Sequence, residues 1–314
     1  MRVVLEPAME YFPARRPCPL HSLPTLTAVP GAQGEQFLGV TFVGYPRRGY
    51  LTFCEKAPPS EAVDPTFDST VLVLHDLADG LATSWPSAKL LRVEDPRAVF
   101  IDTLEYLQNH ELIGASSLLP EAPTVSPKAR IGTSAVVEAG VQIDDGVTIG
   151  NGAIVHAGTW LKRGASIGAN CVIGSTGINA YMGRDGRRRG FPHLAGAIIG
   201  EGSSLGAGCV AVRGILSSTH VGAGCIIGNL CNIGHGVEIA NNAWISVGTM
   251  IGGHSNIGEF ATIAMGCTIR DNTRIGARAN VGMGSVVTKH VRADSSVFGN
   301  PARSRSAINA GPAR

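Results

Sequence analysis

The sequence predicts a mainly β protein in which a parallel β-solenoid follows a small α/β domain. Three observations support this prediction: aliphatic residues recur at every sixth position, the repeats are rich in Gly and poor in aromatic residues, and roughly the first 110 residues lack the repeat. A period of six fits neither the 3.6-residue period of an amphipathic helix nor the two-residue alternation of a strand. It is typical of a solenoid made of short strands and corners.

The aliphatic anchors occur in three runs, at positions 125–173, 199–211 and, after a slip of four residues, 221–287. The fifth residue of each hexad is small or β-branched, as in Ala135 and Val141. We expect both positions to point inward and Gly or polar residues to form the corners. Three hexads would close one coil, and successive coils would stack as parallel strands about 4.8 Å apart.

Residues 1–110 are expected to form the α/β domain, with strands at Gln36–Phe42, Gly49–Phe53 and Thr70–Leu74. A helical pattern over Pro96–Asn109 is opened by Asp95-Pro96.

A linker is expected over 111–124 because Pro recurs there and just beyond it. The solenoid is expected over 125–292, interrupted by a loop at 177–197, and a carboxyl-terminal tail over 293–314.

Composition excludes several classes of function. The net charge is +2, which gives no argument for nucleic acid or for an anionic membrane. No apolar run approaches the ~20 residues of a transmembrane helix, and the stretch 1–7 is too short and broken for the apolar core of a signal peptide. The sequence therefore predicts a cytoplasmic protein without a transmembrane segment.

The seven cysteines form no CxxC pair, and no pair of histidines shows the five-residue spacing of a zinc β-helix enzyme of the γ-carbonic anhydrase kind. Five of the cysteines occupy the fifth hexad position and are predicted to be core residues: Cys171, Cys209, Cys225, Cys231 and Cys267. The sequence predicts neither a metal site nor a bound cofactor.

A series of motifs within the solenoid is more specific than the repeat itself. They occur in the order Ile173-Gly174-Ser175-Thr176-Gly177, Gly190-Phe191-Pro192-His193-Leu194, Ile199-Gly200, Arg213-Gly214-Ile215-Leu216 and Asn232-Ile233-Gly234-His235-Gly236. This order resembles UDP-3-O-acylglucosamine N-acyltransferase, a member of the hexapeptide-repeat acyltransferases with a left-handed parallel β-helix. The stretches Gly49–Phe53 and Val93–Pro96 resemble that enzyme's nucleotide-binding domain.

The resemblance implies an enzyme of the lipid A biosynthesis type that transfers an acyl group from a thioester donor, acyl-CoA or acyl carrier protein, to the amine of a nucleotide-linked amino sugar. It implies a homotrimer, which would bury the flat outer faces of the coils. The resemblance also makes Phe53 a candidate substrate contact.

The sequence departs from that family at several positions. Gly228 stands where the family has an Asp seven residues before the catalytic His, and Asn272 stands where a second family His falls. The stretch Glu55–Pro58 replaces the uracil-pocket motif, and the ending Gly299–Arg303 is more like that of a sugar acetyltransferase. These departures leave open another sugar, another acyl donor, or both.

His235 is the candidate general base, because a His with a pKa near 6.5 suits removal of an amine proton near neutral pH. The alternative is a solvent-facing corner His. Gly253 lies 18 residues later, one coil along, where its N–H could bind the developing oxyanion; it could also simply ease a corner. His254 is a candidate substrate contact, and Asn229 and Asn232 are candidates to orient His235 in place of the missing acid.

The interrupting loop is basic and contains candidate contacts for an anionic ligand, such as a sugar diphosphate or the phosphates of the acyl donor: Tyr181, Arg184, Arg187, Arg188, Arg189 and His193. A solvated charged face is the alternative. Two other functions also remain open at this point: O-acetylation of a sugar by acetyl-CoA, and a non-catalytic scaffold that binds a nucleotide sugar.

Overall fold

The computed structural model describes residues 11–41, 47–56, 66–113 and 122–304. These residues form two compact units. One contains residues 122–177 and 195–304, and the other contains 11–56 and 66–113, without the gap at 42–46, together with 178–194. The segment 178–194 was expected to interrupt the solenoid, and it groups with the amino-terminal unit. Most of the expected linker, at 114–121, and the tail beyond residue 304 lie outside the described residues.

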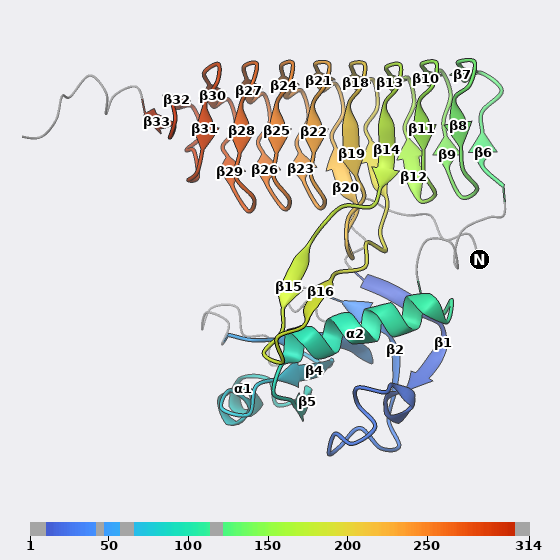
Figure 1. Ribbon diagram of the computed structural model, residues 1–314, viewed down its shortest axis with the longest axis vertical. Coiled ribbons are helices and arrows are strands. Elements are labelled where there is room, and N and C mark those ends of the chain that lie inside the picture. Colours follow the sequence, from blue (N-terminus) through green and yellow to red (C-terminus); the bar gives the residue numbers. More distant parts are fainter. Residues whose placement is uncertain (1–10, 42–46, 57–65, 114–121, 305–314) are drawn as a thin grey trace, which may run out of the picture. The chain divides into compact units, whose positions relative to one another are not determined.

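The first unit is a left-handed parallel β-helix whose short strands form three sheets (Figure 1). Sheet I contains β7 (Arg130–Ile131), β10 (Thr148–Ile149), β13 (Ser166–Ile167), β18 (Ser204–Leu205), β21 (Ile226–Ile227), β24 (Trp244–Ile245), β27 (Thr262–Ile263), β30 (Asn280–Val281), β32 (Ser296–Phe298) and β33 (Arg303–Ser304).

Sheet II contains β8 (Val136–Val137), β11 (Ile154–Val155), β14 (Val172–Ser175), β19 (Val210–Val212), β22 (Asn232–Ile233), β25 (Met250–Ile251), β28 (Thr268–Ile269) and β31 (Val286–Val287). Sheet III contains β6 (Thr124–Val125), β9 (Gln142–Ile143), β12 (Thr159–Leu161), β17 (Ala197–Ile199), β20 (Thr219–Val221), β23 (Glu238–Ile239), β26 (Asn256–Ile257) and β29 (Arg274–Ile275).

The interior of the β-helix is built as the repeat predicts. Anchors such as Ile233 and fifth-position residues such as Val237 are fully buried. Burying one such aliphatic side chain stabilises the folded state by about 1.5–3 kcal/mol relative to leaving it exposed to water. The anchors Val125 and Ile131 are both 41% exposed, because the first coil has a neighbour on only one side.

The five fifth-position cysteines are buried and free, which confirms them as core residues. Their thiols also tie adjacent coils together. For example, Cys209 Sγ donates to the carbonyl of Gly228 over 3.0 Å, and Ser255 Oγ donates in the same way to Arg270 over 3.0 Å. A small polar side chain at this position therefore satisfies a corner carbonyl that would otherwise be buried without a partner.

Both interruptions of the repeat fall at the corner between sheets II and III. Residues 178–194 come between β14 and β17, and the four extra residues come between β19 and β20 in the next coil. Arg213 stabilises this corner because its guanidinium donates to the backbone carbonyls of Gly174 and Ala157. The turn also requires glycine at 214, where a Cβ would lie 1.6 Å from the carbonyl oxygen of Ser217.

The carboxyl-terminal end of the β-helix is closed by β32, which pairs with β30, and by β33, which turns back antiparallel to it. The stretch Gly299–Arg303 forms this turn, with Gly299 N–H donating to Ser285 Oγ and Ala302 N–H to the carbonyl of Val286. The ending that is like a sugar acetyltransferase is thus part of a structural cap.

The second unit contains a five-stranded sheet of β1 (Tyr11–Pro19), β2 (Gln36–Thr41), β3 (Tyr50–Cys54), β4 (Thr70–Val73) and β5 (Lys89–Arg92). β1 is antiparallel to β2, and the other neighbours are parallel. The expected strands are confirmed as β2, β3 and β4. The Pro-rich β1 was not expected to be a strand, and its register shifts between Pro13 and Cys18.

Two helices complete the second unit, which also contains the short helix η1 (Leu20–Ser22). α2 spans Pro96–Asn109, as predicted, with Asp95 accepting from Ala98 N–H as its cap. Its inner face includes Phe100, whose ring centroid lies 5.0 Å from that of Phe53 on β3. α1 (Ala78–Ser84) leads to Trp85, which stacks on Phe67 with centroids 4.5 Å apart.

Candidate functional site

His235 lies in the turn between β22 and β23, at the corner between sheets II and III. The residue is half-buried, and its Nδ1 is buried. The turn is held from below by Thr219, a buried residue whose Oγ1 accepts a hydrogen bond from Gly236 N–H over 2.8 Å. The backbone on both sides of the candidate base is thus fixed by Ile233 in the core and by Thr219.

Gly253 lies in the next coil, directly over His235. A Cβ built on Gly253 would lie 2.6 Å from both Cε1 and Nε2 of the His235 ring. The backbones also approach closely, because a Cβ on Gly234 would lie 2.7 Å from Gly253 N. The N–H of Gly253 donates no hydrogen bond within the described part of the chain. The predicted juxtaposition is therefore present, and a backbone donor lies beside the imidazole edge.

His254 follows Gly253 and joins the same corner. Its N–H donates to the carbonyl of His235 over 2.9 Å, and the two rings meet edge to face with centroids 4.8 Å apart and planes at 78°. Burial lowers the pKa of His254, and the nearby carboxylate of Asp271 partly opposes this. His254 is consequently biased toward the neutral imidazole at neutral pH.

The two candidate orienting residues lie on other parts of the coil. Asn229 lies at the corner between sheets I and II, where its Oδ1 accepts from Ala207 N–H over 2.9 Å. Asn241 makes the equivalent bond to Ala223 N–H, so this contact is a recurring support for corners. Asn232 lies on β22 in register with Val210 and Met250. A carboxylate at Gly228 has no room, because a Cβ there would lie 2.6 Å from Val247 N.

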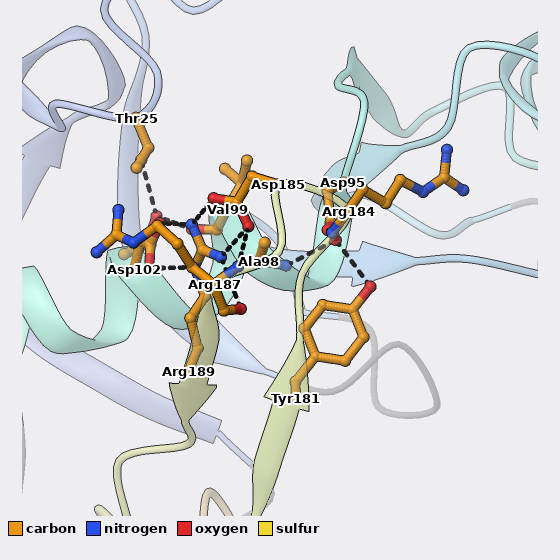
Figure 2. Close-up of polar contacts among 11 residues, drawn as sticks. Thr25, Asp95, Ala98, Val99, Asp102, Tyr181, Arg184, Asp185, Arg187 and Arg189 are labelled. Carbon is orange, nitrogen blue, oxygen red and sulfur yellow. Dashed lines mark hydrogen bonds and ion pairs between the residues drawn. The ribbon is translucent and has the colours of Figure 1, made fainter.

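The basic loop forms a two-stranded antiparallel hairpin of β15 (Ala180–Met182) and β16 (Arg188–Gly190). Figure 2 shows that Arg189 lies between two carboxylates. Its Nε and Nη2 donate to Asp102 over 2.7 and 3.0 Å, and its Nη1 and Nη2 donate to Asp185 over 2.8 and 2.9 Å. Only 9% of its side chain is exposed. Arg189 therefore anchors the hairpin to α2, and the expectation that it serves an anionic ligand is corrected.

Some of the other hairpin residues make hydrogen bonds or are buried, and the rest are exposed. Tyr181 Oη donates to Asp95 over 3.1 Å, and the backbone N–H of Arg184 donates to the same carboxylate over 2.8 Å (Figure 2). His193 is 5% exposed and so lies in the interior, not on a binding surface. The side chains of Arg184, Arg187 and Arg188 are exposed and remain the candidate anion contacts.

Phe53 lies beside a cation rather than in an open pocket. The Arg97 guanidinium lies 5.8 Å from the Phe53 ring centroid and 4.9 Å from that of Tyr181, and it pairs with Glu55. Of the stretch that replaces the family's uracil motif, Glu55 thus contacts Arg97, while positions 57 and 58 lie outside the described residues.

Several residues at these sites had no signal in the sequence. Asp102, Thr219 and Asp271 lie in unremarkable local contexts, and each gains its partner only from another coil or another element. The helix-cap position of Asp95 was recognisable, but its second partnership with the hairpin was not.

Within the described residues, no cluster of three or more His, Cys, Asp or Glu could hold a metal ion. In the same part of the chain, no helix is both long and apolar enough to cross a membrane.

Comparison with known proteins agrees with this architecture. The family model for the bacterial transferase hexapeptide (six repeats) matches residues 254–289. UDP-3-O-acylglucosamine N-acyltransferase of Maricaulis maris is 36% identical over 74 residues, which is 24% of this chain and 21% of that protein. The enzyme of the same name from Pseudoalteromonas translucida is 37% identical over 78 residues, or 25% of this chain and 23% of that protein. This chain thus covers less than a quarter of the length of these relatives.

Among solved structures, the UDP-N-acetylglucosamine acyltransferases of Bacteroides fragilis and Campylobacter jejuni are similar, with TM-scores of 0.44 and 0.41 at 18% and 16% identity. Each alignment covers 62% of this chain and 79% of the other. Neither likeness bears on substrate or chemistry. The repeat, the family match and the curated relatives make this chain similar, over part of its length, to the bacterial hexapeptide transferases.

Proposed function

We propose that the protein transfers an acyl group from a thioester donor, acyl-CoA or acyl carrier protein, to the amine of a nucleotide-linked amino sugar. The observation that supports this most directly is the His235 ring lying against Gly253, whose N–H has no acceptor among the described residues. A base and an oxyanion donor side by side are the two groups that acyl transfer requires.

In this mechanism His235 accepts a proton from the amine as the nitrogen attacks the thioester carbonyl. Charge develops on the carbonyl oxygen, and the N–H of Gly253 stabilises it. Collapse of the tetrahedral intermediate expels the thiolate of the donor, which takes up a proton, and leaves an amide on the sugar.

The acceptor class is proposed from the named relatives, which are N-acyltransferases of an acylated UDP-glucosamine. The exposed Arg184, Arg187 and Arg188 are proposed to bind phosphate groups of one substrate, since guanidinium forms strong charge-assisted bonds with phosphate.

We propose a homotrimer as the working assembly. Large apolar side chains are exposed at the corner between sheets I and II, in the column Val247, Met265 and Met283, and on sheet I at Ile226 and Trp244. Association would bury such a contiguous patch.

The test is a mass-spectrometric screen that pairs acyl-CoA and acyl-carrier-protein donors with a panel of nucleotide-linked amino sugars. Transfer is expected as an amide product together with release of free thiol in equal amount. Product that forms only with hydroxyl acceptors would replace the proposal with sugar O-acetylation. No turnover with any pair, combined with nucleotide-sugar binding, would favour the non-catalytic scaffold.

A further inference from the structure

The rings of His235 and His254 interlock through two glycines of the corner between sheets II and III. The His235 ring fills the space over Gly253, and the His254 ring fills the space over Gly236, where a Cβ would lie 2.5 Å from its Nδ1 and 2.7 Å from its Cε1. Each imidazole thus occupies the hollow left by a glycine of the neighbouring coil.

This arrangement restricts the candidate base. His254 lies in the coil that follows His235 and makes two contacts with it. The edge-to-face contact, with centroids 4.8 Å apart, restricts the ring of His235, and the hydrogen bond from His254 N–H to the His235 carbonyl restricts its backbone. Asn229, one of the residues considered for orienting the base, is committed to Ala207 N–H at another corner. Gly228 cannot carry an acid without shifting the backbone of the next coil.

Asp271 lies at the same corner, one coil beyond His254. His235, Gly253 and Asp271 are spaced 18 residues apart and so occupy the same position in three successive coils. The Oδ2 of Asp271 accepts a hydrogen bond from Asn272 Nδ2 over 2.9 Å. The turns on either side of His254, with the strands they enter, carry these charged or titratable side chains: His235, Glu238, Arg270, Asp271 and Arg274. Of these, Asp271 is the carboxylate that acts on the charge of His254.

We propose that His254 is a positioning residue for His235, and that Asp271 supplies this corner with a carboxylate in place of the one that the sequence lacks at Gly228, which lies at the corner between sheets I and II. The inference rests on the proposed function, with His235 as base, and reassigns His254 from a substrate contact to a support of the base. A misdirected imidazole loses much of its effect as a base, since reacting groups must be held within a fraction of an ångström.

The first test is kinetic. His254→Ala is expected to lower kcat by about 10-fold to 100-fold with KM nearly unchanged. His254→Phe, which keeps a flat ring over Gly236, is expected to restore most of the activity. A substrate contact would show the opposite split, with KM raised and kcat retained, and would overturn the proposal. His290→Ala is the matched control, since His290 lies further along the β-helix, in the turn that follows β31, and its Nδ1 accepts from Arg274 N–H.

The second test needs no turnover and so separates this inference from the proposed function. In the resting protein, imidazole 15N resonances followed through a pH titration are expected to show the pKa of His254 falling in Asp271→Asn, because a carboxylate favours the imidazolium. The His235 resonances are expected to shift in His254→Ala and not in His290→Ala. Unchanged His235 resonances in His254→Ala would refute the positioning role. Shifted resonances in a protein that transfers no acyl group would instead refute the acyltransferase.

Discussion

The imidazole of His235 occupies the space that a side chain at Gly253 would need, with Cε1 and Nε2 both 2.6 Å from the position of a Cβ there. The two residues are 18 apart in sequence and meet because one coil of the β-helix spans that distance. Glycine at 253 therefore leaves the space that the His235 ring occupies. Its φ lies outside the left-handed region, so its own backbone would allow other residues.

Gly253→Ala is expected to lower acyl transfer at least 10-fold while leaving the melting temperature almost unchanged. The added methyl displaces the His235 ring, a flexible side chain, and keeps the N–H of residue 253. In a His235→Ala background the same substitution should have no further effect, because the ring it displaces is gone. Additive losses in this double-mutant cycle would show that Gly253 acts independently of His235.

His235→Ala is expected to retain the assembly and its thermal stability and to lose acyl transfer by roughly 100-fold or more, the usual scale for removing a general base. The fold should tolerate the change because Ile233 and Val237 provide the packing of this coil. Turnover is measured by thiol release and the assembly by light scattering. Near wild-type activity would show that the base lies at another corner.

The arginines of the hairpin are expected to separate into two classes. Arg189→Ala should destabilise the amino-terminal unit by about 1–3 kcal/mol, because it leaves Asp102 without its charge-assisted partner. The double variant Arg187→Ala/Arg188→Ala should leave the melting temperature unchanged and raise the KM for one phosphorylated substrate more than it lowers kcat. Unaltered kinetics in the double variant would show those two side chains to be a solvated surface.

Asp95 should make the amino-terminal unit sensitive to acid. Burial acts to raise the pKa of Asp95, but hydrogen bonds from Arg184 N–H, Ala98 N–H and Tyr181 Oη outweigh it, and the pKa is lowered. A carboxyl whose pKa is lower in the folded state stabilises that state above its unfolded pKa of about 3.9. This stability is lost as the pH falls through the lower, folded-state value.

The measurement is thermal unfolding followed across about pH 2.5 to 6 in the wild type and in Asp95→Asn. The difference between the two should be largest above about pH 4 and shrink toward low pH. A difference that stays constant with pH would show that the bonds of Asp95 do not depend on its charge.

The assembly can be checked directly. Light scattering at micromolar protein is expected to give three times the mass of one chain. Met265→Glu and Met283→Glu, which place charges in the exposed apolar column, should shift the protein toward the monomer if that column is in the interface. A wild-type protein that is monomeric under these conditions would exclude the trimer.

The β-helix could be predicted from the six-residue repeat alone. A period of six, with anchors such as Ile233 and small fifth-position residues such as Cys231, predicts stacked coils with the anchors inside, and the structure follows this pattern apart from the exposed anchors of the first coil. The same arithmetic placed Gly253 over His235, because residues 18 apart in a regular solenoid are neighbours in space.

Contacts between residues that are not related by the six-residue repeat could not be predicted. Arg189 and Asp102 are 87 residues apart and belong to elements with no shared period, so the basic loop could be interpreted only as an anion site or a solvated face. The ring orientation of His254, fitted over Gly236, likewise depends on side-chain packing that the repeat does not specify. The positions that are buried in a repeat can be predicted from the sequence, because they recur at a fixed spacing along the chain. Pairings between distant segments that share no repeat cannot, because they depend on where the tertiary structure places those segments.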